Sequence, residues 1–287
     1  MHSTLISAAQ LQSLMAGNTP PLVLDCSFDL MNPATGVEQF QQAHIPGARH
    51  VHLDRDLSAH DGQARASGGR HPLPTREAFA VWLAGIGLES DQQVVVYDRQ
   101  GANYCGRLWW MIKWCGHEAV AVLDGGLQAW QAAGGAVATG PSASLPAAPG
   151  GFSLRPSCAP VLGTQELARR LGQPDQTVVD ARGAPRFRGE VEPLDPVAGH
   201  IPGALNRPFT DNLGPDGLFK PAAQLREEFE RLLAGRNPAS VVHHCGSGVS
   251  AVPNLLAMEV AGLGRAALYP GSWSEWCNTP GLPCARM

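Results

Sequence analysis

The feature that most constrains the fold of this chain is an internal duplication. Four short landmarks occur in the same order in the two halves of the 287 residues. The first is an apolar strand that ends in aspartate (22–25 and 178–180), and the second is a His-Ile-Pro-Gly-Ala run (44–48 and 200–204). The third is an apolar strand with a polar end (94–98 and 241–245), and the fourth is a glycine-containing turn before tryptophan (124–130 and 270–276). Four matches in one order indicate two copies of one structural unit. The length agrees, since a domain commonly has about 100–200 residues.

Amphipathic stretches lie between the strand-like runs. In residues 223–233, Leu225, Phe229, Leu232 and Leu233 recur at helical spacing, so one face of this predicted helix is apolar. The pattern is typical of a helix that covers a sheet.

A second helix is predicted at 165–171, with Thr164 as its N-cap. Strands interleaved with helices favour a mainly parallel sheet with helices on both faces. The sequence therefore predicts an α/β protein of two tandem domains, 1–138 and 160–287. The segment 139–159 between them is rich in Gly, Pro, Ala and Ser, as expected of a linker.

Composition and charge exclude several classes of partner and location. The net charge of −4, with scattered basic residues, argues against nucleic acid as a partner. No apolar run approaches the ~20 residues that a membrane span needs, and the N-terminus lacks the pattern of a secretory signal. The seven cysteines form no Cys-x-x-Cys pair, which favours a reduced cytoplasmic location.

Cys245 is the residue with the greatest chemical consequence. It follows the apolar run 241–244 and begins a loop of small residues that leads to a helix-compatible segment at 254–259. In such a strand–loop–helix turn, several backbone N–H groups and a helix N-terminus point at the thiol, which favours its thiolate and makes it a nucleophile. A buried structural cysteine is the alternative interpretation. The first copy has Asp98 at the matching position, so its own loop should be catalytically inert.

The same loop argues against the phosphatases that form a cysteinyl phosphate. Those enzymes use His-Cys, five further residues and an arginine that binds the phosphate oxygens through two hydrogen bonds. His244 and Cys245 fit this pattern, but Ala251 stands where the arginine is required. A loop of small residues suits a substituent the size of one sulfur atom on Cys245.

The run Cys-Gly-Ser-Gly-Val-Ser-Ala at 245–251 resembles the active-site loop of the 3-mercaptopyruvate sulfurtransferases, within the rhodanese superfamily. The resemblance implies two rhodanese-like domains, of which the second is active. It also implies that Cys245 takes up sulfur as a persulfide while backbone N–H groups of the loop bind the anionic sulfur. The loop residues that would bind substrate are Gly246, Gly248, Val249 and Ser250.

The resemblance further implies a proton relay beside the nucleophile. Ser247 would join His71 and Asp54, which lie in the first half of the chain after the His-Ile-Pro-Gly-Ala run. Such a relay could polarise the carbonyl of the donor or manage the proton as sulfur departs. The alternatives are a surface histidine beside prolines for His71 and a helix or turn cap for Asp54.

An arginine should bind the anionic group of the donor. By resemblance this is Arg186, whereas Arg182 and Arg188 are expected to pair with carboxylates of the fold or to be solvated. The mercaptopyruvate enzymes often have a second substrate arginine shortly after this segment. Residues 190–196 contain none, which leaves open another anion anchor or another donor.

The residues after the cysteine bear on the identity of the donor. Thiosulfate-specific rhodaneses resemble one another in carrying basic residues there, which suit a small dianion. This chain has Gly246 and Ser247 instead, so the side chains of the loop add no positive charge. The loop therefore favours a monoanionic keto acid over thiosulfate.

These observations predict a sulfurtransferase that moves sulfur from 3-mercaptopyruvate through a Cys245 persulfide to a thiol, thioredoxin or cyanide. No metal or organic cofactor is required, and His50, His52 and His60 are expected to be solvated loop residues and not metal ligands. The alternatives are a thiosulfate:cyanide sulfurtransferase and a persulfide carrier or redox-sensing module with little turnover.

Overall fold

The computed structural model describes residues 1–287 except 143 and 146, which both fall in the predicted linker. By their contacts the described residues form two compact units. Unit 1 comprises Met1–Ala64, Pro74–Ala159 and Pro215–Leu218, and unit 2 comprises Arg65–Leu73, Pro160–Gly214 and Phe219–Met287. The segment Arg65–Leu73 therefore groups with unit 2, although it lies in the first half of the sequence. That 1–138 and 160–287 fold as separate domains stays a prediction.

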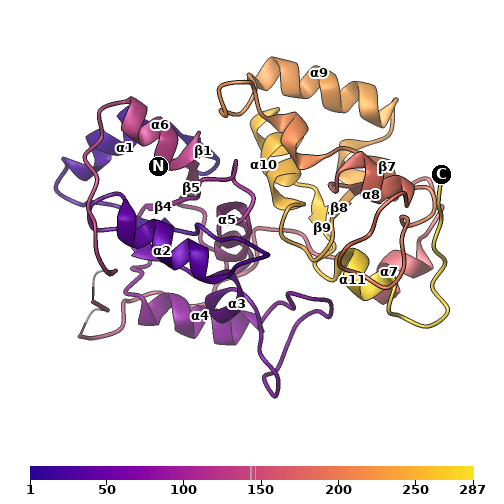
Figure 1. Ribbon diagram of the computed structural model, residues 1–287, viewed down its shortest axis with the longest axis horizontal. Coiled ribbons are helices and arrows are strands. Elements are labelled where there is room, and N and C mark those ends of the chain that lie inside the picture. Colours follow the sequence, from indigo (N-terminus) through magenta and orange to yellow (C-terminus); the bar gives the residue numbers. More distant parts are fainter. Residues whose placement is uncertain (143, 146) are drawn as a thin grey trace. The chain divides into compact units, whose positions relative to one another are not determined.

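Unit 1 is built on a sheet of five parallel strands in the order β1-β5-β4-β2-β3. Figure 1 labels β1, β4 and β5 of this sheet and the helices α1–α6 around them. The strands are β1 (Leu5–Ile6), β2 (Leu22–Asp25), β3 (Arg49–His50), β4 (Val94–Tyr97) and β5 (Val120–Leu123). The helices are α1 (Ala8–Met15), α2 (Ala34–Gln42), α3 (Leu53–Asp56), α4 (Arg76–Gly85), α5 (Cys105–Trp114) and α6 (Gly126–Ala132).

Unit 2 is built on a sheet of four parallel strands in the order β7-β6-β8-β9. The strands are β6 (Thr177–Asp180), β7 (Leu205–Asn206), β8 (Val241–His244) and β9 (Ala267–Leu268). The helices are α7 (Thr164–Arg169), α8 (Ala184–Arg188), α9 (Ala222–Leu233), α10 (Val252–Val260) and α11 (Ser272–Trp276), with short 3-10 helices η1 (Phe209–Asn212) and η2 (Pro238–Ser240).

The two sheets repeat one another strand for strand. Reading from β3 or from β7, the order is the same in both units, so that β2 corresponds to β6, β4 to β8 and β5 to β9. Even the edge strand β1 has a counterpart, because Val161 forms a parallel bridge with Leu268 of β9. The predicted duplication and the predicted α/β fold are confirmed.

The interior strands and the edge strand β9 are buried along their whole length, which suits their largely apolar sequences, whereas the edge strands β3 and β7 are half-buried. The core of unit 1 contains Val95 and Tyr97 of β4 together with Trp130 of α6. The core of unit 2 contains Val242 of β8 together with Trp273 of α11. Polar residues end several of these strands, as Asp180 does in β6 and His244 in β8, although His243 lies within β8.

The His-Ile-Pro-Gly-Ala runs have a structural role in both units. In each, the histidine Nδ1 lies 2.8 Å from a backbone carbonyl, that of Phe40 for His44 and that of Phe187 for His200. The same pairs stack, with ring centroids 3.9 Å and 4.0 Å apart. The glycine of each run has a positive φ, 79° and 77°, which only glycine adopts at no steric cost.

The predicted helices are present with one correction. Helix α9 buries Leu225, Phe229 and Leu233, as the spacing indicates. Helix α7 begins at Thr164 itself, and Gly163 is its N-cap without a side-chain hydrogen bond. The prediction that Thr164 caps this helix is therefore wrong, because its hydroxyl lies 3.0 Å from the hydroxyl of Tyr269 and is used in tertiary packing.

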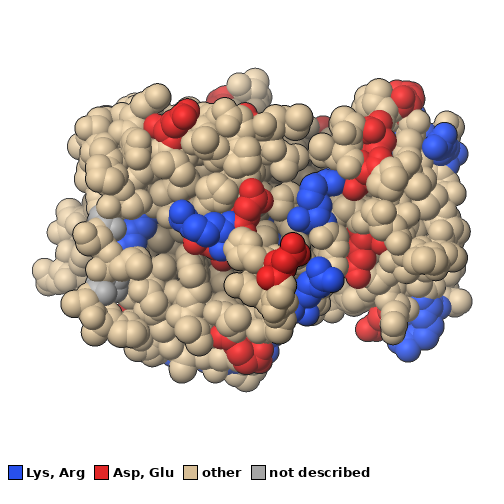
Figure 2. All heavy atoms as spheres, turned by 60° about the horizontal axis from the view of Figure 1, so that its bottom comes forward, with Lys and Arg blue, Asp and Glu red and all other residues tan. Residues whose placement is uncertain are grey.

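The surface shown in Figure 2 carries acidic and basic side chains that lie mixed among uncharged residues. Among the residues that the structure describes, no helix is both long enough and apolar enough to pass through a bilayer.

Asp98 ends the strand β4 and organises the loop that follows. Its two carboxylate oxygens accept hydrogen bonds from the backbone N–H groups of Gln100 (2.9 Å), Ala102 (3.1 Å), Tyr104 (2.8 Å) and Cys105 (3.0 Å). The side chain is 2% exposed. Unit 1 thus contains a ring of backbone donors with an acidic side chain of the same chain at its centre.

We expect Asp98→Ala to lower the free energy of unfolding by at least about 2 kcal/mol, because four backbone N–H groups, three of them buried, lose their carboxylate acceptor. Urea denaturation of the whole chain measures the change. Asp98→Asn, which keeps one acceptor oxygen, should lose less. The control is Asp61→Ala, at an exposed position. Equal stability of Asp98→Ala and Asp61→Ala would contradict this account of the loop.

Candidate active site

Cys245 lies directly after β8, which is an interior strand of the sheet in unit 2. Its side chain is 1% exposed. Its N–H donates to the hydroxyl of Ser272 (3.1 Å), and its carbonyl accepts from the N–H of Trp273 (3.0 Å). The first turn of α11 therefore fixes the backbone of the thiol on both sides.

The loop after Cys245 leaves several backbone donors unpaired. Among the described residues, no acceptor is present for the N–H groups of Gly246, Ser247, Val249, Ser250 and Ala251. Buried N–H groups are normally paired, so a set of unpaired donors in one loop is unusual. The spacing from Cys245 to the start of α10 equals that from Asp98 to the start of α5. By this internal comparison, the loop suits a negative charge carried by Cys245.

The two histidines before the nucleophile are buried and bring no positive charge. Burial is the main cause that lowers the pKa of His243 to about 3, and its Nε2 lies 3.1 Å from the sulfur of Met258. His243 is thus part of the packing between β8 and α10. Burial also lowers the pKa of His244, whose Nδ1 lies 3.2 Å from the carbonyl of Cys245. Positive charge near the thiol must come from arginines.

Ser247 and His71 lie side by side in the structure, as the family resemblance implies. The Ser247 hydroxyl lies 2.7 Å from Nδ1 of His71, and both side chains are buried, at 6% and 5% exposed. His71 is consequently no surface histidine. Which of the two groups donates depends on the tautomer of the imidazole.

The segment that carries His71 is attached to α11 through its backbone. The N–H of Gly68 donates to the Glu275 carboxylate (3.2 Å), and the N–H of Arg70 donates to the hydroxyl of Ser274 (3.0 Å). Gly69 has φ +85°, and a Cβ there would lie 2.6 Å from the carbonyl oxygen of residue 271. Glycine is thus required for this close approach, which brings His71 to the loop of Cys245.

Asp54 lies in unit 1, in the short helix α3. The cap of that helix is His52, whose Nδ1 accepts from the N–H groups of Asp54 (3.2 Å) and Arg55 (3.3 Å). The participation of Asp54 in a relay with His71 stays a prediction.

Arg182 and Arg188 are paired with carboxylates, as expected from the sequence. Arg182 is buried and binds Asp180 at 2.6 Å and Glu192 at 3.2 Å. Arg188 lies in α8 and binds Glu190 at 2.7 Å on the surface. Both arginines thus have carboxylate partners within the same unit.

Arg186 lies near the nucleophile loop, as the resemblance implies. Its Nη2 lies 2.7 Å from the Glu192 carboxylate and 3.5 Å from that of Asp195. Its Nη1 faces the loop, since a methyl group placed on Gly246 would lie 3.5 Å from it.

A second arginine at this place was not identified from the sequence. Arg70 Nη1 binds Asp195 at 2.8 Å, and its Nη2 would lie 3.1 Å from a methyl group on Gly246. The sequence held one indication: Arg70 directly precedes His71, so it must also lie near the loop of Cys245 if His71 does. Two guanidinium groups therefore face Gly246 from two distant parts of the chain.

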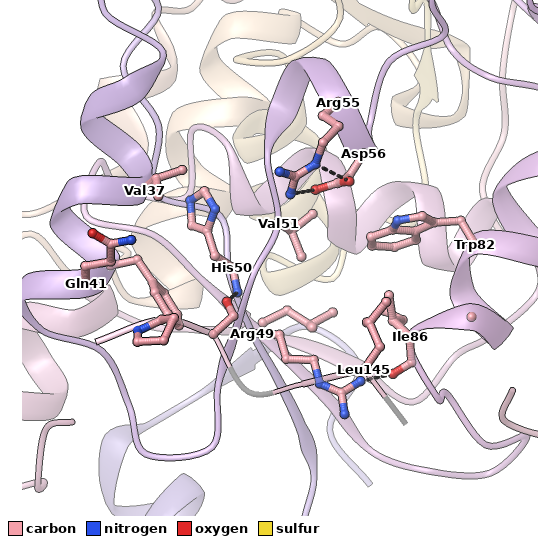
Figure 3. Close-up of a pocket in the computed structure, with 15 residues that line it drawn as sticks. Val37, Gln41, Arg49, His50, Val51, Arg55, Asp56, Trp82, Ile86 and Leu145 are labelled. Atoms are coloured by element: carbon pink, nitrogen blue, oxygen red, sulfur yellow. Dashed lines mark hydrogen bonds and ion pairs between the residues drawn. The ribbon is translucent and has the colours of Figure 1, made fainter. Parts of the chain in front are cut away.

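A cavity of about 520 Å³ lies elsewhere, in unit 1 (Figure 3). Its lining is mainly apolar and includes Phe40, Val51 and Trp82, with Arg49 as one of its charged side chains. No cysteine is among the residues that line it. This cavity is distinct from the residues around Cys245.

The histidines of the first half make local contacts. His50 belongs to β3, not to a loop as expected, and its Nε2 lies 3.0 Å from the carbonyl of Ser27. His60 Nε2 lies 3.1 Å from the carbonyl of Arg55. Within the described part of the chain, no three His, Cys, Asp or Glu side chains are grouped so that they could hold a metal ion.

Comparison with known proteins agrees with the duplicated fold. The family model for the rhodanese-like domain matches residues 7–133 and again 163–279. A Pseudomonas aeruginosa protein described as "Probable 3-mercaptopyruvate sulfurtransferase" is 47% identical over 98% of this chain and 99% of its own length. The thiosulfate/3-mercaptopyruvate sulfurtransferase 2 of Arabidopsis thaliana is 32% identical over 93% of this chain and 82% of its own length.

The solved structure of 3-mercaptopyruvate sulfurtransferase from Leishmania major is similar to this chain with a TM-score of 0.83 and 29% sequence identity, covering 98% of this chain and 76% of that chain. The family model matches more than half of the residues, once in each half. This chain therefore belongs to the rhodanese family and carries two rhodanese-like domains.

Proposed function

We propose that this protein is a sulfurtransferase that takes sulfur from 3-mercaptopyruvate and passes it on through a persulfide of Cys245. The observation that carries the proposal is the loop of Cys245, in which backbone donors without acceptors surround the end of β8. The similarity to sulfurtransferases over nearly the whole chain supports it.

In the first half-reaction, the Cys245 thiolate attacks the sulfur of 3-mercaptopyruvate. A sulfur–sulfur bond forms, and the bond between that sulfur and the methylene carbon breaks with its electron pair moving to carbon. The carbanion is stabilised as the enolate of the neighbouring keto group. The proton of the donor thiol is transferred to this carbon, so pyruvate leaves and a Cys245 persulfide anion remains.

The loop N–H groups stabilise the negative charge of the outer sulfur. Their counterparts around Asp98 hold a carboxylate through four hydrogen bonds of 2.8–3.1 Å. Donors fixed before the reaction need no reorganisation when the charge develops. The groups assigned this role are those of Gly246, Gly248, Val249 and Ser250.

Ser247 and His71 manage the proton in this proposal. Their contact of 2.7 Å lies next to the nucleophile and is buried. The pair can accept the proton of the donor thiol and return it to the enolate carbon, or polarise the keto oxygen. Asp54 would complete this relay by orienting His71.

In the second half-reaction, an acceptor attacks the outer sulfur, and Cys245 leaves as thiolate. A small thiol, the exposed cysteine of a thioredoxin or cyanide can serve as the acceptor. In each half-reaction the electron pair of the broken bond stays with the leaving group, carbon of the donor in the first and Cys245 in the second. A neutral sulfur atom is transferred each time, so the cycle is balanced without a redox cofactor.

The charges around the loop favour a monoanionic donor. Arg70, Arg182 and Arg186 are matched by the three carboxylates that they bind, those of Asp180, Glu192 and Asp195. The cluster therefore adds little net positive charge, and Gly246 and Ser247 add none. Thiosulfate, a dianion, is the second candidate donor, because two guanidinium groups still face the loop.

We expect Cys245→Ser to abolish sulfur transfer, because a serine hydroxyl is barely ionised near neutral pH and cannot form a persulfide. Single replacements of the other six cysteines should leave activity intact. Mass spectrometry of wild type treated with donor should locate one added sulfur on Cys245. Substantial turnover by Cys245→Ser would remove the proposed nucleophile.

Steady-state rates with 3-mercaptopyruvate and thiosulfate, measured side by side with cyanide as acceptor, test the donor. We expect kcat/KM to be at least about tenfold higher for 3-mercaptopyruvate, since a dianion gains less from a cluster of balanced charge. A strong preference for thiosulfate would reverse the ranking. A single round of persulfide formation without turnover would indicate a carrier.

Ser247→Ala and His71→Gln should each lower kcat with 3-mercaptopyruvate by about 10²-fold or more, as expected for loss of positioned proton transfer. The double variant should lose no more than either single variant, because the two groups act as one unit. Multiplicative losses in the double variant would mean that the two residues act independently.

A further inference from the structure

Two guanidinium groups meet over the residue that follows the nucleophile. A methyl group placed on Gly246 would lie 3.1 Å from Nη2 of Arg70 and 3.5 Å from Nη1 of Arg186. These two nitrogens come from segments far apart in the sequence, yet both are within 3.5 Å of one point. We propose that Arg70 is the second arginine that binds the carboxylate of the donor, and so a specificity-determining residue of this site.

Two carboxylates hold the guanidinium groups of Arg70 and Arg186 so that the other N–H groups face Gly246. Asp195 accepts from Nη1 of Arg70 at 2.8 Å and lies 3.5 Å from Nη2 of Arg186. Glu192 holds the other side of Arg186 at 2.7 Å. Both carboxylates are buried, at 4% and 3% exposed, so they hold the planar groups rigidly. The nitrogens that remain are those that face Gly246.

Arg70 keeps donors without protein acceptors. Nη2 makes no hydrogen bond among the described residues, and its buried Nε has no partner there either. Arg182 in the same cluster differs, because its nitrogens reach Asp180, Glu192 and the carbonyl of Gly199. A purely structural arginine satisfies its donors, as Arg182 does, whereas Arg70 directs some of them to the place of a substrate.

The chemistry suits a carboxylate. Each carboxylate oxygen accepts hydrogen bonds from guanidinium N–H groups, and two arginines on one carboxylate restrict its orientation. Arg70 and Arg186 are 25% and 22% exposed, so a small molecule can reach them. Arg70 thereby supplies the second guanidinium that residues 190–196 lack. The inference rests on the proposed function and specifies how that site recognises its donor.

The alternative role for Arg70 is a tether that holds residues 65–73 to Asp195. A tether would support His71, and its loss would lower kcat for every donor. A carboxylate ligand would instead affect binding of molecules that carry the carboxylate. The two roles therefore differ in their effect on KM and kcat and in their dependence on the ligand's charge.

The experiment compares wild type, Arg70→Gln and the control Arg188→Gln, whose arginine is paired with Glu190 on the surface. The probes are 3-mercaptopyruvate as donor, and pyruvate and methyl pyruvate as competitive inhibitors. We expect Arg70→Gln to raise KM for 3-mercaptopyruvate and the inhibition constant of pyruvate about 10- to 100-fold. Its kcat and the inhibition constant of methyl pyruvate should change less than about threefold. Arg188→Gln should resemble wild type.

Arg70→Lys keeps the charge without the planar fork and should recover part of the pyruvate binding. If Arg70→Gln does not fold, Arg70→Lys replaces it in the same binding measurements. Unchanged pyruvate binding in the Arg70 variants, or equal loss for pyruvate and methyl pyruvate, would overturn the proposal. Failure of the proposed function is a separate outcome, since wild type would then form no Cys245 persulfide with 3-mercaptopyruvate.

Discussion

The convergence of backbone N–H groups at the end of a parallel strand is the interaction on which the rest of this structure depends. A strand that leads through a tight loop into a helix turns several donors toward one point, where a negative charge is stabilised. In unit 1 the charge is supplied by the carboxylate of Asp98, with four hydrogen bonds. In unit 2 the same position holds Cys245, so the N–H groups are placed to donate hydrogen bonds to a negatively charged sulfur on this residue. One backbone design thus gives a structural loop and a candidate reactive loop.

The groups around Cys245 carry little net positive charge, but the guanidinium N–H groups have fixed directions. The buried histidines of β8 have lowered pKa values and stay neutral near pH 7. The arginines are each bound by a carboxylate, which balances their charge and fixes the plane of each guanidinium. Ligand binding at such a site depends on whether the acceptor oxygens match the remaining N–H directions. A cluster of this kind can select an anion although its net charge is small.

Local patterns predicted the fold and part of the site, and long-range contacts decided the remainder. The duplication, the buried strands and α9 follow from spacing and composition. The contact between Ser247 and His71 was predicted only through the family resemblance, because 176 residues separate them. The position of Arg70 beside Gly246 was not predicted, although Arg70 directly precedes His71, because only the structure shows that residues 65–73 group with unit 2. Tertiary packing also explains the wrong cap, because Thr164 contacts Tyr269 instead.

The loop of Cys245 must be rigid although its donors are unpaired, and α11 resolves this conflict. The carbonyl of Cys245 accepts from the N–H of Trp273 at 3.0 Å, and the carbonyl of Gly246 accepts from the N–H of Ser274 at 2.9 Å. Gly248, with φ +73°, allows the loop to approach the carbonyl oxygen of Pro270 so closely that a Cβ would lie 2.3 Å from it. The loop is therefore held through its carbonyls, while the N–H groups of Gly246, Ser247, Val249, Ser250 and Ala251 have no acceptor among the described residues. Each unpaired buried donor costs about 1–3 kcal/mol of stability, and an anion bound at the loop would offset that cost.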